Sequence, residues 1–469
     1  MEGDIAKFDV VIVGGGPAGY GAALYGASAG LKIALVEYDK VGGTCLHRGC
    51  IPAKELLESA AVYRHVQHAA EFGVYVDEPR VDWSVTIDRK QRVIDQMFGG
   101  LSSLLKSRKV TVFAGTGTLE PNRVVHVAGA DGESTRIEGA AIILATGSAP
   151  RTIPGFEPDG QRIFTSDEFL DLRTLPGTAA VVGGGAIGCE FASTLADMGT
   201  SVTILEGLPK ILPGCDADVA SIVERSFKKK GITIRTGVSV QSHTQLESGA
   251  TSVSLGDGSA LDVDIVVISV GRRPLTDGVV DSQCQVRVTD RGFFEVNEWN
   301  RTGEADVWAI GDCINTPQLA HIGFIEGINA IKDILGERFT PIAYDKVPWA
   351  IYCQPEVSFA GHSEQSAIEA GFSVVTAKHR FMGNGRAVIL GQTDGLVKVI
   401  AQKNPDGSAG TILGVHMVGP WVTEQLGQGY FAVNWEATVD DVANLIQPHP
   451  SLSELFGETV LSMTGRSLH

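Results

Sequence analysis

The chain has 469 residues, a length that predicts about three domains. With 43% apolar and 20% charged residues it has the composition of an ordinary globular protein, and its net charge of −17 argues against non-specific binding to nucleic acid. Seven cysteines, an odd number scattered along the chain, do not resemble the disulfide framework of a small secreted protein.

A glycine-rich turn follows the first apolar run, Val10 to Val13. The turn reads Gly-x-Gly-x-x-Gly at Gly14, Gly16 and Gly19, and a helix-forming stretch comes next. Glycines at these positions permit a tight turn and the close approach of a pyrophosphate to the helix N-terminus. Glu37 closes the next apolar run and is placed to accept a ribose 2′-hydroxyl. The segment predicts a dinucleotide site.

The first apolar stretch also imitates a membrane span, because residues 10–31 carry no charged side chain. The seven glycines and Pro17 within it argue against insertion. No basic segment precedes Phe8, as a signal peptide would require. We therefore expect a cytoplasmic protein that binds neither membranes nor nucleic acid.

Two thiols, Cys45 and Cys50, come shortly after this site. Their position suggests a redox pair that exchanges electrons with a cofactor, while unpaired structural thiols and a metal site using His47 are the alternatives. Residues five apart in one α-helix lie about 7.5 Å apart along its axis, whereas a disulfide needs Cα atoms within about 7 Å. A bridge therefore requires Cys45 to lie in the turn before the helix. Cys50 is expected near the helix N-terminus, where the dipole favours a thiolate.

A second glycine-rich turn has the same layout as the first. Gly183, Gly185 and Gly188 again follow an apolar run, and Glu206 closes the next one. Two such units, each with a strand, a helix and a trailing acid, are strong evidence for two dinucleotide sites. The Glu206 carboxylate repels a 2′-phosphate, and no arginine lies between Glu206 and Pro213, so NAD is favoured over NADP.

Further apolar runs end in short polar or glycine motifs. They are Ile142–Leu144 before Ala145, Thr146 and Gly147; Ile265–Val270 before Gly271; and Val307–Ile310 before Gly311 and Asp312. From about Tyr344 the pattern predicts alternating strands at Val374–Val375, Leu396–Ile400 and Ile412–Val415, followed by helices near Thr423–Ala437 and Leu452–Met463.

The last motif is His449-Pro450 with Glu454 downstream. Ser451 and Glu454 match a helix capping box, which is one explanation for the glutamate. A lone histidine is more often structural than catalytic. A thiol–disulfide enzyme near pH 7, however, benefits from a base that holds the proton of a leaving thiol, so His449 is also a candidate base.

In this order and spacing, the motifs resemble those of the flavin-dependent pyridine nucleotide-disulfide oxidoreductases from end to end. The resemblance implies an α/β fold with two Rossmann-like dinucleotide-binding domains, for FAD and NAD, and a C-terminal α+β dimerisation domain. It divides the chain into an FAD-binding domain at 1–150, an NAD-binding domain at 151–273, a central domain at 274–344 and an interface domain at 345–469. It also implies a homodimer.

The resemblance implies roles for individual residues. Cys50 would lie against the flavin, and Cys45 would exchange with a dithiol substrate. Lys54 would lie near flavin N5, paired with Glu190. His449 would be the base, oriented by Glu454 and acting on the partner subunit's disulfide. The implied NAD contacts are Val238 and Gly271. The implied FAD contacts are Glu37, Gly43, Thr44, Gly117, Ala145, Thr146, Gly147, Gly311, Asp312 and Ala320.

Within the family, the chain is most similar to members that oxidise protein-bound dihydrolipoamide with NAD. The resemblance thus implies partners in a 2-oxo acid dehydrogenase complex, namely its lipoyl domain and acyltransferase core. Another NAD(P)H-dependent disulfide or quinone reductase, and a non-catalytic scaffold, are the alternatives. Departures from the family pattern at His47, Ala53 and Ala186 put substrate access and rate in doubt, more than the chemistry.

Overall fold

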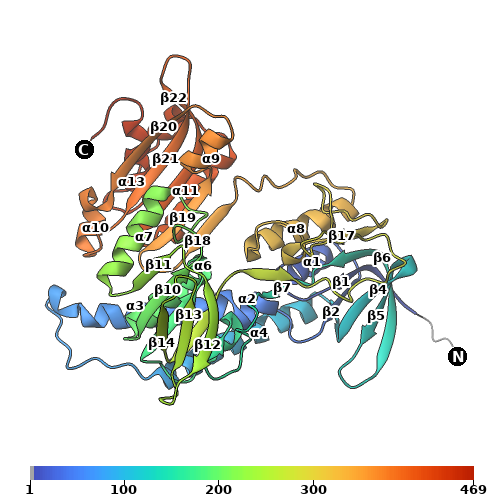
Figure 1. The fold of residues 1–469 in the computed structure, drawn as a ribbon. Coiled ribbons are helices and arrows are strands. Elements are labelled where there is room, and N and C mark those ends of the chain that lie inside the picture. Colours follow the sequence, from blue (N-terminus) through green and yellow to red (C-terminus); the bar gives the residue numbers. More distant parts are fainter. Residues whose placement is uncertain (1–4, 469) are drawn as a thin grey trace. The chain divides into compact units, whose positions relative to one another are not determined.

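The computed structural model describes residues 5–468. The chain forms two compact units, each built from separate segments (Figure 1). The first contains the described residues up to Glu55, Ser84–Arg151 and Gly271–Tyr344; the second contains Leu56–Trp83, Thr152–Val270 and the described residues from Asp345 onward.

The first unit is built on a parallel sheet in the order β3-β2-β1-β6-β17. These strands are Thr111–Ala114, Ile33–Glu37, Ala6–Val13, Ser134–Leu144 and Val307–Ala309. Alternate residues of β1 enter two different cores, so the strand is buried on both faces, as its continuous apolar run predicts. One face is covered by α1 (Pro17–Ser28) and α8 (Ala320–Ile334), while β4 (Thr116–Glu120) and β5 (Val124–Ala128) extend β6 as an antiparallel meander.

The second unit repeats this plan. A parallel sheet runs in the order β11-β10-β9-β15-β8, and an antiparallel meander of β12, β13 and β14 follows β11 in the chain. Its helices include α6 (Ala186–Asp197) and α7 (Ala217–Lys229). The strands are Thr233–Thr236, Ser201–Glu206, Thr178–Val182, Ile265–Ile268 and Ile163–Phe164, then Val240–Gln245, Thr251–Leu255 and Ala260–Val263.

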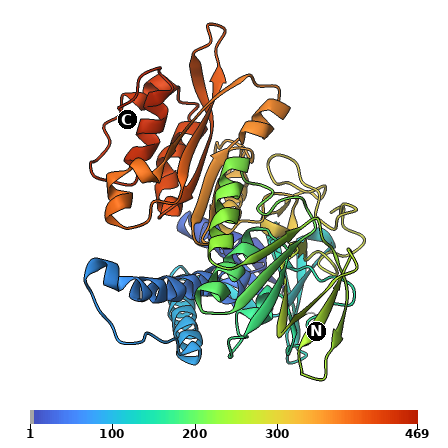
Figure 2. The same ribbon diagram turned by 60° about the vertical axis from the view of Figure 1, so that its left-hand side comes forward.

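A five-stranded antiparallel sheet completes the second unit, in the order β18-β19-β22-β21-β20. Helices α11 (Val422–Asn434) and α13 (Glu454–Ser462) pack on this sheet through an apolar core, and α7 lies beside β22 (Figure 2). The strands are Pro348–Ile351, Glu356–Gly361, Ala409–Gly419, Leu396–Lys403 and Val374–Arg380; shorter helices are α5 (Ser166–Phe169), α9 (Glu364–Glu369), α10 (Gly385–Ile389) and α12 (Val439–Ala443).

The predicted fold class, two Rossmann-like domains and a C-terminal α+β domain, is confirmed. Among residues 5–468, no helix has both the length and the apolar character that crossing a membrane demands. The predicted C-terminal strands and helices correspond to β20, β21, β22, α11 and α13, whereas the short helix α12 was not predicted.

One row of side chains crosses the C-terminal sheet on the face opposite the α11 and α13 core. Trp349 stacks on Phe359, which stacks on His416, and Lys398 is the cross-strand neighbour of His416. His416 Nε2 lies 2.9 Å from the carbonyl oxygen of His362. Burial lowers the pKa of His416 from 6.5 to about 4, so this ring is neutral in the folded protein near pH 7.

The pKa of His416 makes the folded state sensitive to acid. Since the folded pKa lies below the unfolded value, the unfolded chain takes up the proton first, and stability is lost as pH falls from about 6.5 toward 4. Between pH 7.5 and pH 5 the expected loss through this residue is about 2 kcal/mol. His416→Gln keeps a donor for His362 but cannot titrate. Urea unfolding at both pH values should show a smaller loss in the variant, and equal losses would contradict the assignment.

Candidate active site

The first glycine-rich turn joins the end of β1 to the start of α1. Gly14 has a φ of +108°, and a Cβ at Gly14 or Gly19 would collide with a backbone carbonyl oxygen, of Ala145 and Gly14 respectively. Gly16 caps α1, whose first residue is Pro17. A helix N-terminus offers N–H groups without intrahelical partners and the positive end of the helix dipole, so this turn fits a pyrophosphate.

A buried carboxylate ties the turn to the neighbouring strand. Glu37, at the end of β2, accepts hydrogen bonds from Gly15 N–H at 2.6 Å and Asp39 N–H at 2.8 Å. Burial raises the pKa of Glu37. The predicted ribose ligand therefore also holds the turn in shape, a role that sequence reasoning missed.

The second turn repeats this geometry. Gly183 also has a φ of +108°, and Glu206 accepts from Gly184 N–H at 2.6 Å and from Leu208 N–H at 2.7 Å. Gly185 caps α6, and a Cβ added there would meet no atom within 4 Å, so the middle glycine faces open space. A Cβ at Gly188 would collide with Gly183, as at the equivalent position of the first turn.

The cysteine pair lies on two helices. Cys45 is in α2 (Gly43–Arg48), and Cys50 is the first residue of α3 (Cys50–Gln67). The helices are separated at Gly49, whose φ of −149° and ψ of −107° are not helical. The expectation that Cys45 precedes the helix as part of a turn is therefore wrong: a break between two helices removes the spacing of a continuous one.

The two thiols contact each other in this structure. The hydrogen bond to Cys50, together with burial, raises the pKa of Cys45. Tyr20, on α1, is close enough that burial and the two thiols raise its pKa to about 12. The pair thus lies beside the first nucleotide turn. Within residues 5–468, no group of three or more His, Cys, Asp or Glu side chains is arranged to hold a metal ion.

The other predicted FAD contacts surround the same strand ends. Asp312 accepts from Ser148 Oγ at 2.5 Å, and Ser148 accepts from Arg272 Nε at 2.7 Å. Gly311 N–H donates to buried Glu326 at 2.6 Å, and Tyr344 donates to the same carboxylate. Ser148 and Arg272 were missed as supports, although each directly follows a predicted motif.

The remaining predicted contacts lie as follows. Gly43 and Thr44 are the first residues of α2, with Gly43 against Gly16, and Ala320 is the first residue of α8. Gly117 lies on β4 beside Val13, the Ala145 N–H donates to the Val13 carbonyl oxygen, and the Thr146 hydroxyl and the Gly147 carbonyl both bond to the backbone of Leu275. In the second unit the Val238 N–H donates to the carbonyl oxygen of Glu206; Gly271, which belongs to the first unit, has a φ of +101°.

In the second unit, His449 and Glu454 form a hydrogen bond. His449 Nδ1 lies 2.9 Å from Glu454 Oε2, and the side chains are 79% and 9% exposed. Asn384 donates to the other carboxylate oxygen at 3.2 Å. Ser451 Oγ accepts from Glu454 N–H, which is one half of the predicted capping box. The carboxylate itself bonds to His449 and Asn384, so Glu454 orients the imidazole. Nothing in the local sequence pointed to Asn384.

Glu190 is buried in α6, where its carboxylate accepts from Tyr352 N–H at 2.9 Å. Lys54 lies on α3 in the first unit, one turn beyond Cys50. The predicted site residues therefore fall into two groups. Cys45, Cys50 and Lys54 belong to the first unit, and Glu190, His449 and Glu454 belong to the second.

Curated relatives match over almost the whole chain. A protein named dihydrolipoyl dehydrogenase from Bacillus subtilis is 38% identical, with 99% of each chain covered. One of the same name from Haloferax volcanii is 37% identical, covering 100% of this chain and 99% of the relative.

Solved structures share the fold. LpdA from Mycobacterium tuberculosis has a TM-score of 0.91 at 26% identity, covering 98% of this chain and 100% of that one. The flavoprotein disulfide reductase RclA from Escherichia coli, in its Cu(II) complex, has a TM-score of 0.86 at 26% identity, covering 98% and 100%. Residues 347–460 match the family's dimerisation domain, which supports a homodimer, and residues 8–327 match the catalytic family itself. The chain belongs to the pyridine nucleotide-disulphide oxidoreductases.

Proposed function

We propose that this protein oxidises protein-bound dihydrolipoamide to lipoamide and reduces NAD⁺, using FAD and a Cys45–Cys50 disulfide. The contact between the two thiols, on the segment that follows β2, carries the proposal. The relatives at 37% and 38% identity support the choice of substrate over a general disulfide reductase, since RclA is only 26% identical.

The proposal includes where each partner binds. We propose four domains: an FAD-binding domain at 1–150, an NAD-binding domain at 151–273, a central domain at 274–344 and an interface domain at 345–469. The glycine turn with Glu37 would hold FAD, and the turn with Glu206 would hold NAD. A lipoyl domain and the acyltransferase core of a 2-oxo acid dehydrogenase complex are the proposed partners. The proposed location is the cytoplasm, because seven cysteines scattered along the chain do not resemble the disulfide framework of a secreted protein.

The dithiol half-reaction starts from the oxidised pair. One substrate thiol gives its proton to His449 as its sulfur attacks Cys45 Sγ. The Cys45–Cys50 bond breaks, and Cys50 leaves as a thiolate favoured by the N-terminus of α3. The second substrate thiol then attacks the substrate sulfur of the mixed disulfide, and its proton passes to Cys45, which is released as a thiol. Lipoamide leaves with its new S–S bond. The substrate has then lost two electrons and the cysteine pair has gained them.

The chain's charged side chains support the proton and electron movements. Glu454 stabilises the imidazolium that forms at His449, because its carboxylate lies on Nδ1. FAD, when bound, supplies the two-electron link between the thiol pair and NAD⁺. We propose that Lys54 and Glu190 lie beside the flavin, and that His449 acts on the disulfide of the partner subunit.

The first prediction concerns nucleotide choice. We expect NAD⁺ to be preferred over NADP⁺, since the buried Glu206 carboxylate would accept the 2′-hydroxyl and repel a phosphate. Glu206→Gln should keep a hydrogen-bonding group and remove the charge, so its ratio of kcat/KM for NAD⁺ over NADP⁺ should fall about tenfold or more. Steady-state assays with both nucleotides measure this ratio. Comparable efficiencies in the unaltered protein would contradict the assignment.

The second prediction separates the two thiols. In Cys45→Ala the remaining Cys50 thiolate should give a long-wavelength absorbance band with oxidised flavin, because Cys50 is proposed to lie against the flavin. Cys50→Ala should lack the band. Absorbance spectra of both purified variants provide the measurement, and a band found only in Cys50→Ala would reverse the roles.

The third prediction concerns the base. His449→Gln should slow flavin reduction by dihydrolipoamide about 10²- to 10⁴-fold, as expected when a positioned base is removed, and leave flavin reduction by NADH nearly unchanged. Asn384→Ser retains a residue that caps α10 but is too short to reach Glu454, so it should cause a smaller loss in the same half-reaction. Stopped-flow measurements of the two half-reactions test both variants.

Subunit exchange gives the control for the base. If His449 serves the partner's disulfide, mixing inactive Cys45→Ala with inactive His449→Gln should restore activity, because a heterodimer contains one intact site. Absence of recovery after demonstrated exchange would show that the site is built within one chain or that His449 is structural.

A further inference from the structure

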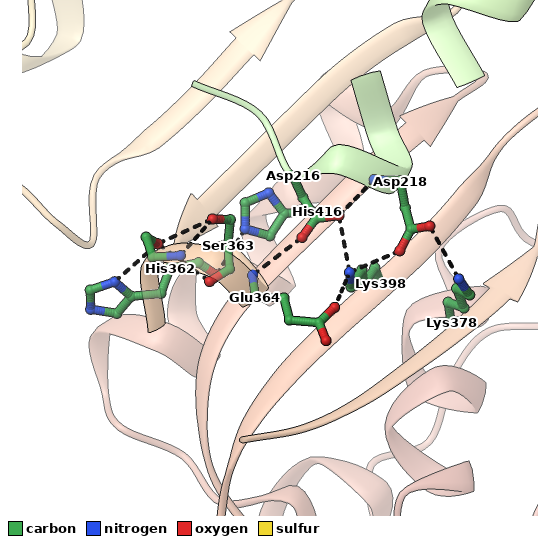
Figure 3. A network of polar contacts seen from close by, with 9 residues as sticks. Asp216, Asp218, His362, Ser363, Glu364, Lys378, Lys398 and His416 are labelled. Atoms are coloured by element: carbon green, nitrogen blue, oxygen red, sulfur yellow. Dashed lines mark hydrogen bonds and ion pairs between the residues drawn. The ribbon is translucent and has the colours of Figure 1, made fainter. Parts of the chain in front are cut away.

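A buried ammonium lies between the C-terminal sheet and the start of α7 (Figure 3). Lys398, on β21, has a side chain that is only 4% exposed. Its Nζ lies 3.1 Å from Asp216, 2.8 Å from Asp218 and 2.6 Å from Glu364, so three carboxylates surround it. These partners raise the pKa of Lys398, which keeps the group charged.

Asp216 connects this cluster to the first residues of α7 and α9. It is 2% exposed, caps α7 by accepting from Asp218 N–H at 3.0 Å, and accepts from Glu364 N–H at the start of α9 at 3.2 Å. A carboxylate this buried needs a compensating cation, since removing one partner of a buried pair leaves an uncompensated charge. Lys398 thus holds the start of α7 against the sheet.

The segment just before Asp216 leads back to the second glycine turn. Leu208 N–H donates to the Glu206 carboxylate at 2.7 Å, and Leu212 N–H donates to Gly184 O at 2.8 Å. Ile211 and Leu212 are 1% and 2% exposed. Residues 207–215 are therefore fixed to the turn at one end and to Asp216 at the other.

We propose that Lys398 is a positioning residue for NAD: through Asp216 it fixes residues 207–215, and these keep Glu206 and Gly184 in the geometry that receives the nucleotide. This inference rests on the proposed NAD site. Lys398 itself touches neither nucleotide nor thiol in this account, and it acts from the sheet of the dimerisation domain.

The predicted defect is specific to the nucleotide. Lys398→Met should weaken NADH binding and raise KM for NAD⁺ about tenfold or more, while flavin reduction by dihydrolipoamide stays within about twofold. Lys398→Arg keeps the charge and should restore most of the affinity. If Lys398→Met is poorly folded, Glu364→Gln removes one charge of the cluster and should weaken NADH binding about two- to threefold.

Lys229→Met provides a matched control. Lys229 is the last residue of α7 and forms an exposed ion pair with Asp394. Like the Lys398 cluster, this ion pair joins α7 to the C-terminal part of the unit, but it lies at the opposite end of the helix. This variant should bind NADH as the unaltered protein does, because exposed pairs contribute little.

NADH titration of the FAD-loaded proteins, followed by fluorescence, measures binding without turnover. Weakened NADH binding with an intact dithiol half-reaction supports the proposal. Unchanged binding in folded Lys398→Met and Glu364→Gln overturns it, and so does parallel loss of both half-reactions and of FAD, which indicates a purely structural role. Failure of the unaltered protein to bind NADH would instead contradict the NAD site itself.

Discussion

The separation of α2 from α3 at Gly49 is the constraint on which this account of the chemistry depends. A continuous helix would hold residues five apart too far along its axis for a disulfide, whereas the break between α2 and α3 lets the thiols of Cys45 and Cys50 meet. The same break makes Cys50 the first residue of α3, where the dipole stabilises a thiolate. The break therefore favours both formation of the bond and departure of one sulfur.

The rest of the fold uses one plan for a nucleotide-binding turn twice, once in each unit. In each unit a strand, a glycine turn and a helix are followed by a strand that ends in a buried glutamate. That glutamate accepts a hydrogen bond from the N–H of the residue after the first glycine of the turn, Gly15 in one unit and Gly184 in the other. The matching distances of 2.6 Å show that the carboxylates of Glu37 and Glu206 stabilise their turns, in addition to the ribose contacts proposed for them.

The features that could be predicted from the sequence are those that depend on residues close together in the chain. The glycine turns, their acids and most C-terminal strands follow from periodicity and spacing. Side-chain contacts between distant segments could not be predicted: Asn384 meets Glu454 across 70 positions, and Lys398 meets Asp216 across 182. The predicted position of Cys45 was wrong because the glycines before it suggested a turn. In the structure α2 begins at Gly43, includes Cys45 and ends at Arg48.

The central claim, a redox disulfide between Cys45 and Cys50, is tested most directly by peptide mapping. Trypsin cleaves after Arg48, so the oxidised protein, alkylated before digestion, should yield two peptides joined through Cys45 and Cys50. Anaerobic addition of one equivalent of NADH should convert both cysteines to alkylated forms and leave the other five unchanged. Free, alkylated Cys45 and Cys50 in the oxidised protein, with NADH still consumed, would contradict the account.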